Sequence, residues 1–250
     1  CMKNYGGFDH NAQTVRILTS LEKKYAKFNG LNLSWECLEG AAKHNGPVLE
    51  PSRALLEYNE KHDLKLNSHA SLEAQVAAIS DDIAYNSHDI EDGIRAELFT
   101  IKDLAELPII GEEISKLKLE YPNIQDDILM NEARSKLIKY LIKDVLTEAH
   151  KNLKNLKIKS VDDVRNANQQ IINFSEAVDN KVSIIRKFLF KNMYKHPKVL
   201  SMTEKAQMVV TDLFKLYMQE PSKMTKGWAD ANFNSEKDKA IIVADFIAGM

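Results

Sequence analysis

Three polar side chains recur at four-residue spacing in the segment that spans residues 71–99, namely Asp81, Tyr85 and Asp89. On an α-helix this spacing places all three on one face, with about 6 Å of axial rise between neighbours. A carboxylate there could hold a divalent cation, because carboxylate oxygens suit hard and borderline metal ions. A tyrosine one turn further on offers an aromatic wall. The spacing fits a functional carboxylate or an ordinary solvated acidic face, and spacing alone favours the solvated face.

The part of this face that precedes Asp81 is small and apolar, since Ala77 and Ala78 lie one turn before it. A carboxylate that adjoins such a surface is expected to be partly desolvated. Buried charge is tolerated when it is paired, hydrogen-bonded or bound to a metal. We therefore single out Asp81. Asp82 points about 100° away and is a poorer candidate. Glu91 and Asp92 are expected to lie on a solvated helix surface.

Two further residues, His10 and Arg134, are candidates for phosphate contacts, whereas His44 is not. His10 lies in the first turn of an expected helix, where free backbone N–H groups attract phosphate, but it is equally compatible with a surface histidine. His44, near a helix C-terminus, is expected to interact with terminal carbonyl groups. Arg134 could reach a phosphate, although an arginine on an amphipathic helix usually faces solvent. The lysine-rich segment 150–159 is interpreted as a helix end whose long side chains cover apolar surface.

Composition narrows the class of protein. The chain has 250 residues, 44% of them hydrophobic, and a net charge of −2, so it can bury one large core or two modest ones. This charge balance does not indicate a nucleic-acid or membrane-surface partner, although local basic patches are not excluded. No apolar run approaches the roughly 18–20 residues of a membrane span. The two cysteines, Cys1 and Cys37, suggest no disulfide framework, which fits a reducing cytoplasm.

The elements that must position these residues are expected to be helices. Glycine and proline are scarce, and no alternating strand pattern is long enough to predict a sheet. Apolar periodicity predicts an all-α fold in which Tyr25, Phe28 and Ile128 are among the buried residues. The expected helices cover residues 9–28, 34–42, 52–61, 71–99, 111–119, 125–154, 160–171, 177–194, 200–219 and 235–249.

Four blocks of the sequence resemble the deoxyguanosine triphosphate triphosphohydrolase-like branch of the HD-domain phosphohydrolases, and they occur in that family's order. They are YGGFDHNAQTVRIL (5–18), GLNLSWECLEG (30–40), KHNGP (43–47) and EAQVAAISDDIAYNSHDIEDG (73–93), and the closing VADFIAGM (243–250) is similar to the family's last helix. The resemblance implies a multi-helix HD-type bundle. Residues 1–100 would form the C-terminal part of the catalytic core, and residues 101–250 would complete the core and supply oligomer contacts.

The resemblance also implies a reaction, the metal-dependent hydrolysis of deoxynucleoside triphosphates to deoxynucleoside and tripolyphosphate. The family's last metal ligand begins an Asp-x-x-x-Tyr-x-x-x-Asp pattern, which falls here on Asp81, Tyr85 and Asp89. Asp81 would ligate a divalent ion (Mg²⁺, Mn²⁺ or another transition metal), Tyr85 would pack against the deoxyribose, and Asp89 would accept a hydrogen bond at the sugar. His10 would lie near the phosphates as a candidate proton donor, and Arg134 would be a triphosphate contact.

The sequence departs from the family pattern in one respect. The histidine and the His-Asp pair that complete the family's metal site are expected before Tyr5. The dipeptides His62-Asp63 and His88-Asp89 occur in residues 1–250, but neither lies in the family's sequence context. The HD core is therefore expected to be incomplete, and this fragment is expected to be inactive by itself. For the complete protein we expect a cytoplasmic homo-oligomer, a hexamer or tetramer with nucleotide sites at its interfaces. The alternatives are a non-catalytic helical module that senses nucleotides or mediates oligomerisation, and an HD phosphohydrolase acting on another nucleotide.

Overall fold

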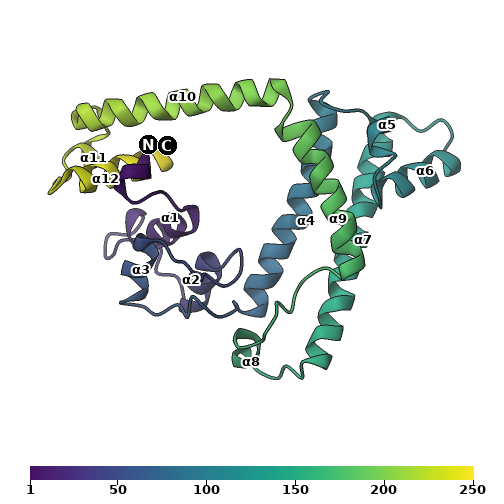
Figure 1. The fold of residues 1–250 in the computed structure, drawn as a ribbon, viewed down its shortest axis with the longest axis horizontal. Helices are drawn as coiled ribbons and strands as arrows, with labels where there is room; N and C mark the ends of the chain where they lie inside the picture. The colour runs from purple at the N-terminus through teal and green to yellow at the C-terminus, as the bar shows by residue number, and fades with distance from the viewer. The chain divides into compact units, whose positions relative to one another are not determined.

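The computed structural model describes residues 1–250, and every regular element in it is helical (Figure 1). The prediction of an all-α fold is therefore confirmed. The chain divides into two compact units: unit 1 comprises residues 1–34, 50–64 and 200–250, and unit 2 comprises residues 35–49 and 65–199. The division at residue 100 that the resemblance implied stays a prediction. None of the helices combines the length and apolarity that a membrane-spanning segment needs.

Unit 2 is built around three long helices that lie side by side, α4, α7 and α9 (Figure 1). Ile90, Leu137 and Ile185, one from each of these helices, are almost completely buried in its core. Its helices are α2 (Trp35–Ala42), α4 (Leu72–Arg95), α5 (Ile101–Leu104), α6 (Ile110–Glu120), α7 (Asp126–Asn155), α8 (Val161–Arg165), α9 (Glu176–Leu189) and the π-helical η3 (Phe190–Tyr194).

Unit 1 has a smaller apolar core, in which Phe214 from α10 and Val243 and Phe246 from α12 are buried. Its elements are η1 (Met2–Tyr5), α1 (His10–Arg16), the π-helical η2 (Ile17–Leu21), α3 (Arg53–Asn59), α10 (Pro197–Gln219), η4 (Pro221–Lys223), α11 (Lys226–Ala229) and α12 (Glu236–Ala248). Of α10, residues 200–219 belong to this unit.

Helix α4 carries the predicted site residues, and its ends have clear physical causes. Ser71 caps the first turn by accepting a hydrogen bond from the backbone N–H of Ala74 at 3.4 Å. The helix ends at Arg95, four residues before the predicted end, because the chain turns back and the N–H of Leu98 bonds to the Gly93 carbonyl at 2.9 Å. This turn places the Phe99 ring against Gly93, where a Cβ atom would come within 2.1 Å of the ring.

The prediction that the first helix extends to residue 28 is wrong, because helical structure ends at Leu21. Tyr25 and Phe28 were expected in the core. Their side chains are instead 49% and 41% exposed, and their rings pack on each other with centroids 4.9 Å apart. The pair is a local aromatic contact in a loop.

Gly30 explains why the chain leaves the helix. It has a positive φ of 73°, and a Cβ atom there would lie 2.5 Å from the carbonyl group of Thr19. The close approach lets the N–H of Leu31 donate to the Leu18 carbonyl at 2.8 Å, so the loop folds back onto the π-helical segment. A continued helix could not make this contact.

Two other predictions need correction. Ile128 is 49% exposed, because the adjacent Leu129 takes the place on α7 that faces the core. The helix predicted at residues 160–171 ends at Arg165. Ile171 is buried in an irregular segment, where the Gln75 side-chain carbonyl accepts its N–H at 2.9 Å.

Candidate functional site

Tyr85 and Asp89 on α4 meet a third side chain, Tyr194, which ends the π-helical segment after α9. The Tyr194 hydroxyl donates a hydrogen bond to the Asp89 carboxylate, and the hydroxyl oxygens of Tyr194 and Tyr85 are 2.6 Å apart. The two phenol rings are nearly parallel, with an interplanar angle of 9° and centroids 6.4 Å apart. Two of the three residues in the predicted pattern therefore belong to one hydrogen-bonded cluster.

These three side chains differ in how deeply they are buried. Asp89 is only 9% exposed, and this burial raises the pKa of its carboxyl group, with the Tyr194 hydrogen bond opposing the rise. Burial, and then the bond to Asp89, raises the pKa of Tyr194 far above its usual range, so its hydroxyl stays protonated and donates. Tyr85 remains 55% exposed and presents ring surface to solvent.

Asp81 lies two turns before Asp89, but its surroundings differ from the prediction. Its side chain is 71% exposed, and Ala77 on the preceding turn is exposed too. The expected desolvation of Asp81 is therefore wrong in this structure. The His44 imidazole lies beside it, with Nε2 3.5 Å from Asp81 Oδ2. His44 was expected to bind helix carbonyl groups, and it lies instead against the candidate metal ligand.

The donor types of Asp81 and His44 suit a divalent ion, because carboxylate oxygen and imidazole nitrogen are common ligands of Mn²⁺ and related metals. Residues 1–250 contain no group of three or more His, Cys, Asp or Glu side chains that could hold a metal ion. Asp81 therefore fits as one contributor to a metal site whose ligand set these residues do not complete.

Arg134 on α7 forms an ion pair with Glu91 on α4. Glu91 was expected to be a solvated surface residue, yet its side chain is 25% exposed and also accepts from Arg95 at 2.8 Å. Because α7 packs beside α4, these opposite charges meet across the helix pair. Any phosphate contact by Arg134 would have to compete with this carboxylate.

His10 is the first residue of α1 and is exposed, in unit 1. The phosphate-binding role predicted from its helix terminus is weakened by Asp9, whose carboxylate accepts from the N–H groups of Asn11 at 2.9 Å and Ala12 at 3.3 Å. These donors are thus satisfied by a negative side chain. The structure leaves the His10 imidazole itself accessible.

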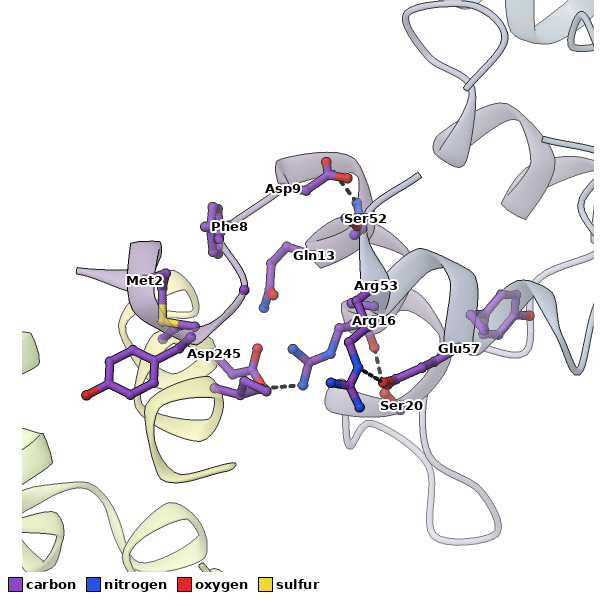
Figure 2. Close-up of a pocket in the computed structure, with 18 of the residues that line it drawn as sticks. Met2, Phe8, Asp9, Gln13, Arg16, Ser20, Ser52, Arg53, Glu57 and Asp245 are labelled. Carbon is purple, nitrogen blue, oxygen red and sulfur yellow. Dashed lines mark hydrogen bonds and ion pairs between the residues drawn. The ribbon is translucent and has the colours of Figure 1, made fainter. Parts of the chain in front are cut away.

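Unit 1 also contains a cleft of about 620 Å³ between α1, α3 and α12 (Figure 2). Its two arginines are paired: Arg16 with Asp245 at 2.5 Å, and Arg53 with Glu57 at 2.7 Å. Burial raises the pKa of the Asp245 carboxyl, and the Arg16 guanidinium opposes the rise. None of the predicted site residues lines this cleft. Since its guanidinium groups are already neutralised, we assign it no function.

Sequence reasoning missed Tyr194 and Arg186, which pairs with Asp82 at 3.2 Å. Tyr194 lies 109 positions after Tyr85, and only the packing of α9 on α4 brings them together. The one structural signal is the π-helical turn, a feature that often marks functional sites. It cannot be read from local composition.

Comparison of the sequence with known protein families gives a match that agrees with the all-helical fold. Residues 172–250, which contain α9 to α12, match the family model of the phosphohydrolase-associated domain.

Curated relatives extend the match to the entire chain. A deoxyguanosinetriphosphate triphosphohydrolase-like protein of Rickettsia peacockii is 44% identical over 252 residues, covering 100% of this chain and 66% of the relative. Proteins of the same name from Roseobacter denitrificans and Parvibaculum lavamentivorans are 47% and 44% identical, each with 65% of its length covered. Over the part that it spans, the chain belongs to this family. It spans slightly less than two thirds of the length of these relatives.

Proposed function

We propose that the protein containing this chain is a metal-dependent deoxynucleoside triphosphate triphosphohydrolase. The observation that carries the proposal is the identity of at least 44% over the full chain to proteins named for dGTP triphosphohydrolysis. A structural observation also supports the proposal, since one helix, α4, carries Asp81, Tyr85 and Asp89. The substrates would be deoxynucleoside triphosphates, and the protein would act in the cytoplasm.

Each residue on α4 has a role that its environment supports. The exposed Asp81 carboxylate would hold a divalent ion, Mg²⁺, Mn²⁺ or another transition metal, together with ligands outside this chain. The exposed ring of Tyr85 would cover the deoxyribose and leave no room for a 2′-hydroxyl. Asp89 would accept a hydrogen bond from the sugar, in place of or beside the one from Tyr194.

In the proposed reaction a water oxygen bonds to the α-phosphorus while the bond from phosphorus to the 5′-oxygen breaks. The products are tripolyphosphate and a deoxynucleoside, whose 5′-oxygen must receive a proton. The bound divalent ion supplies neutralisation of the triphosphate charge. His10 is the proposed proton donor because its imidazole is accessible, and Arg134 would contact the triphosphate after leaving Glu91.

A homo-oligomer is the proposed assembly, as the resemblance implied. Helix α7 supports it because Ile142 and Leu146 are 45% and 55% exposed on one outward face. Exposed apolar residues at helical spacing are typical of surfaces that other protein elements cover. Light scattering of the full-length protein would test this assembly.

The experiment that tests the activity compares the full-length protein with its Asp81→Ala variant. Each is incubated with a mixture of the four dNTPs and Mn²⁺ or Mg²⁺, and tripolyphosphate and deoxynucleoside are separated by chromatography. We expect wild-type release that is lost in the variant. Asp82→Ala is the matched control, because Asp82 is the adjacent carboxylate and points about 100° away from Asp81.

Different outcomes separate the alternatives. Release of pyrophosphate or monophosphate instead of tripolyphosphate would indicate an HD phosphohydrolase of another specificity. No release with all dNTPs present would overturn the enzymatic proposal in favour of a nucleotide-sensing or oligomerisation module. Equal activity of wild type and Asp81→Ala would refute the role of Asp81.

A further inference from the structure

Helix α2 is fixed against α4 at very close range. A Cβ atom on Gly40 would come within 2.9 Å of the Ala74 side chain, so a larger residue at position 40 would force the two helices apart. One turn after Gly40 is His44, and about two turns after Ala74 is Asp81. His44 lies in the turn that follows α2, and its contact with Asp81 is a second contact between this part of the chain and α4.

The end of α2 is held by a buried charge network that the proposed reaction does not use. The Glu39 carboxylate is fully buried and accepts from Lys43 Nζ at 2.9 Å. Arg165, the last residue of α8, binds both oxygens of the same carboxylate, each at 2.9 Å. Two parallel bonds of this kind fix direction as well as distance.

Lys43 extends the network into the loop that precedes α4. Its ammonium group also donates to Ser68 Oγ at 3.0 Å and to the His69 carbonyl at 3.4 Å. The three acceptors satisfy the three ammonium protons. Burial lowers the pKa of Lys43, with the bond to Glu39 opposing the change. The lysine backbone consequently has little freedom, and the next residue in the chain is His44.

We propose that the Glu39, Lys43 and Arg165 network is a positioning device that sets the His44 imidazole against Asp81 and thereby orients this carboxylate for the divalent ion. The inference rests on the proposed function in that Asp81 is taken as a metal ligand. His44 is a positioning residue because it acts through Asp81. Groups that hold a ligating carboxylate in place typically change metal affinity by about 10-fold to 100-fold when they are removed.

The solvent exposure of His44 and Asp81 argues that their contact orients the Asp81 carboxylate and does not stabilise the fold. The His44 and Asp81 side chains are 41% and 71% exposed, and ion pairs with this much solvent contribute little to folding. Removal of the imidazole should therefore leave the stability of the protein unchanged. Any loss of metal affinity can then be distinguished from a loss of structure.

The experiment measures Mn²⁺ affinity of the metal-free full-length protein by calorimetric titration, with the thermal midpoint as the structural control. His44→Ala should bind Mn²⁺ at least about 10-fold more weakly at an unchanged midpoint, and His44→Gln, which keeps an N–H donor, should recover part of the affinity. His150→Ala is the matched control. His150 is an exposed histidine of the same unit, with Nδ1 2.6 Å from the Leu146 carbonyl oxygen, and its replacement should leave affinity at the wild-type value.

A thermodynamic cycle tests whether the network acts through His44. Arg165→Lys keeps the charge but loses the two parallel bonds, so it should weaken Mn²⁺ binding in the wild-type background and have no further effect in His44→Ala. If the effects of Arg165→Lys and His44→Ala on Mn²⁺ affinity are additive, the network does not act through His44.

An affinity of His44→Ala within twofold of wild type would overturn the inference while leaving the proposed function intact. Mn²⁺ binding with no dNTP hydrolysis would remove the proposed function and leave the affinity comparison valid. A wild-type protein that binds no Mn²⁺ would overturn both.

Discussion

Replacement of Glu39 by glutamine should destabilise the protein far more than replacement of Lys43 by methionine, although the two residues are direct partners. The buried network contains two cations, Lys43 and Arg165, and one carboxylate. Glu39→Gln leaves two like charges in a buried site, and the Asp162 carboxylate, 3.6 Å from Arg165 and 70% exposed, offsets them only weakly. Lys43→Met leaves one carboxylate bound by one guanidinium group, which is a neutral pair.

The magnitudes follow from this charge count. Loss of the only anion from a buried ion pair costs about 3–5 kcal/mol. Lys43→Met removes a desolvated ammonium, while the Ser68 hydroxyl still donates to the His69 carbonyl at 3.4 Å and Arg165 still binds Glu39, so its cost should be about 1 kcal/mol. With a urea m-value of about 2 kcal/mol/M, Glu39→Gln should lower the unfolding midpoint by roughly 2 M.

Urea unfolding of the full-length protein, followed by circular dichroism, measures both values. Lys151→Met is the control, because Lys151 lies in the same unit and its bond to Glu148 at 2.9 Å is formed by a side chain that is 61% exposed. Its cost should stay below about 0.5 kcal/mol. A cost of less than about 1 kcal/mol for Glu39→Gln, or equal costs for the Glu39 and Lys43 variants, would refute the reasoning.

Three further outcomes are expected. The folded-state pKa of Glu39 is lowered, since hydrogen bonds from Arg165 and Lys43 together outweigh the rise that burial causes. Its stabilising contribution should therefore be complete above about pH 4.3 and be lost as the pH falls through the folded-state value, so urea titrations should show wild type and Glu39→Gln converging in acid. Tyr194→Phe removes the hydroxyl that binds a buried carboxylate and should lower the free energy of unfolding by about 2 kcal/mol, with no loss if the bond is unimportant. Gly30→Ala meets both a positive φ of 73° and the Thr19 backbone at 2.5 Å, whereas Gly7→Ala meets a positive φ of 82° in open space. In thermal unfolding, Gly7→Ala should therefore cost about 1 kcal/mol and Gly30→Ala clearly more, and equal costs would contradict the close approach.

Much of the fold could be predicted because the long helices carry their own signals. The helices predicted to start at Ser71 and Ser160 are capped by these serines, and the periodic apolar residues of α7 are buried as expected from Ala133 to Ala149. The errors occur where tertiary contacts override periodicity. Tyr25 and Phe28 continue a helical pattern, but the loop closed by Gly30 gives the backbone other hydrogen-bond partners.

The candidate site was predictable only in the part that lies on one helix. Spacing places Asp81, Tyr85 and Asp89 on one helix face, and the family resemblance is what singles them out as a site. Tyr194 depends on a helix about a hundred residues later in the chain. The contact between His44 and Asp81 was also missed, because it depends on the packing of Gly40 against Ala74 and on the buried network behind it. Such cross-element contacts leave no local pattern.

Because of the π-helical turn at residues 190–194, the position of Tyr194 in the site depends on the number of residues in this turn. Its defining hydrogen bond runs from the N–H of Lys195 to the Phe190 carbonyl at 3.0 Å, one residue wider than an α-helical turn. Deletion of a single residue here would allow an ordinary α-helix and rotate the remaining residues of this turn by about 100°. Tyr194 would then leave Asp89. A one-residue change in length could thus alter the site more than most substitutions, with no change in any residue of α4.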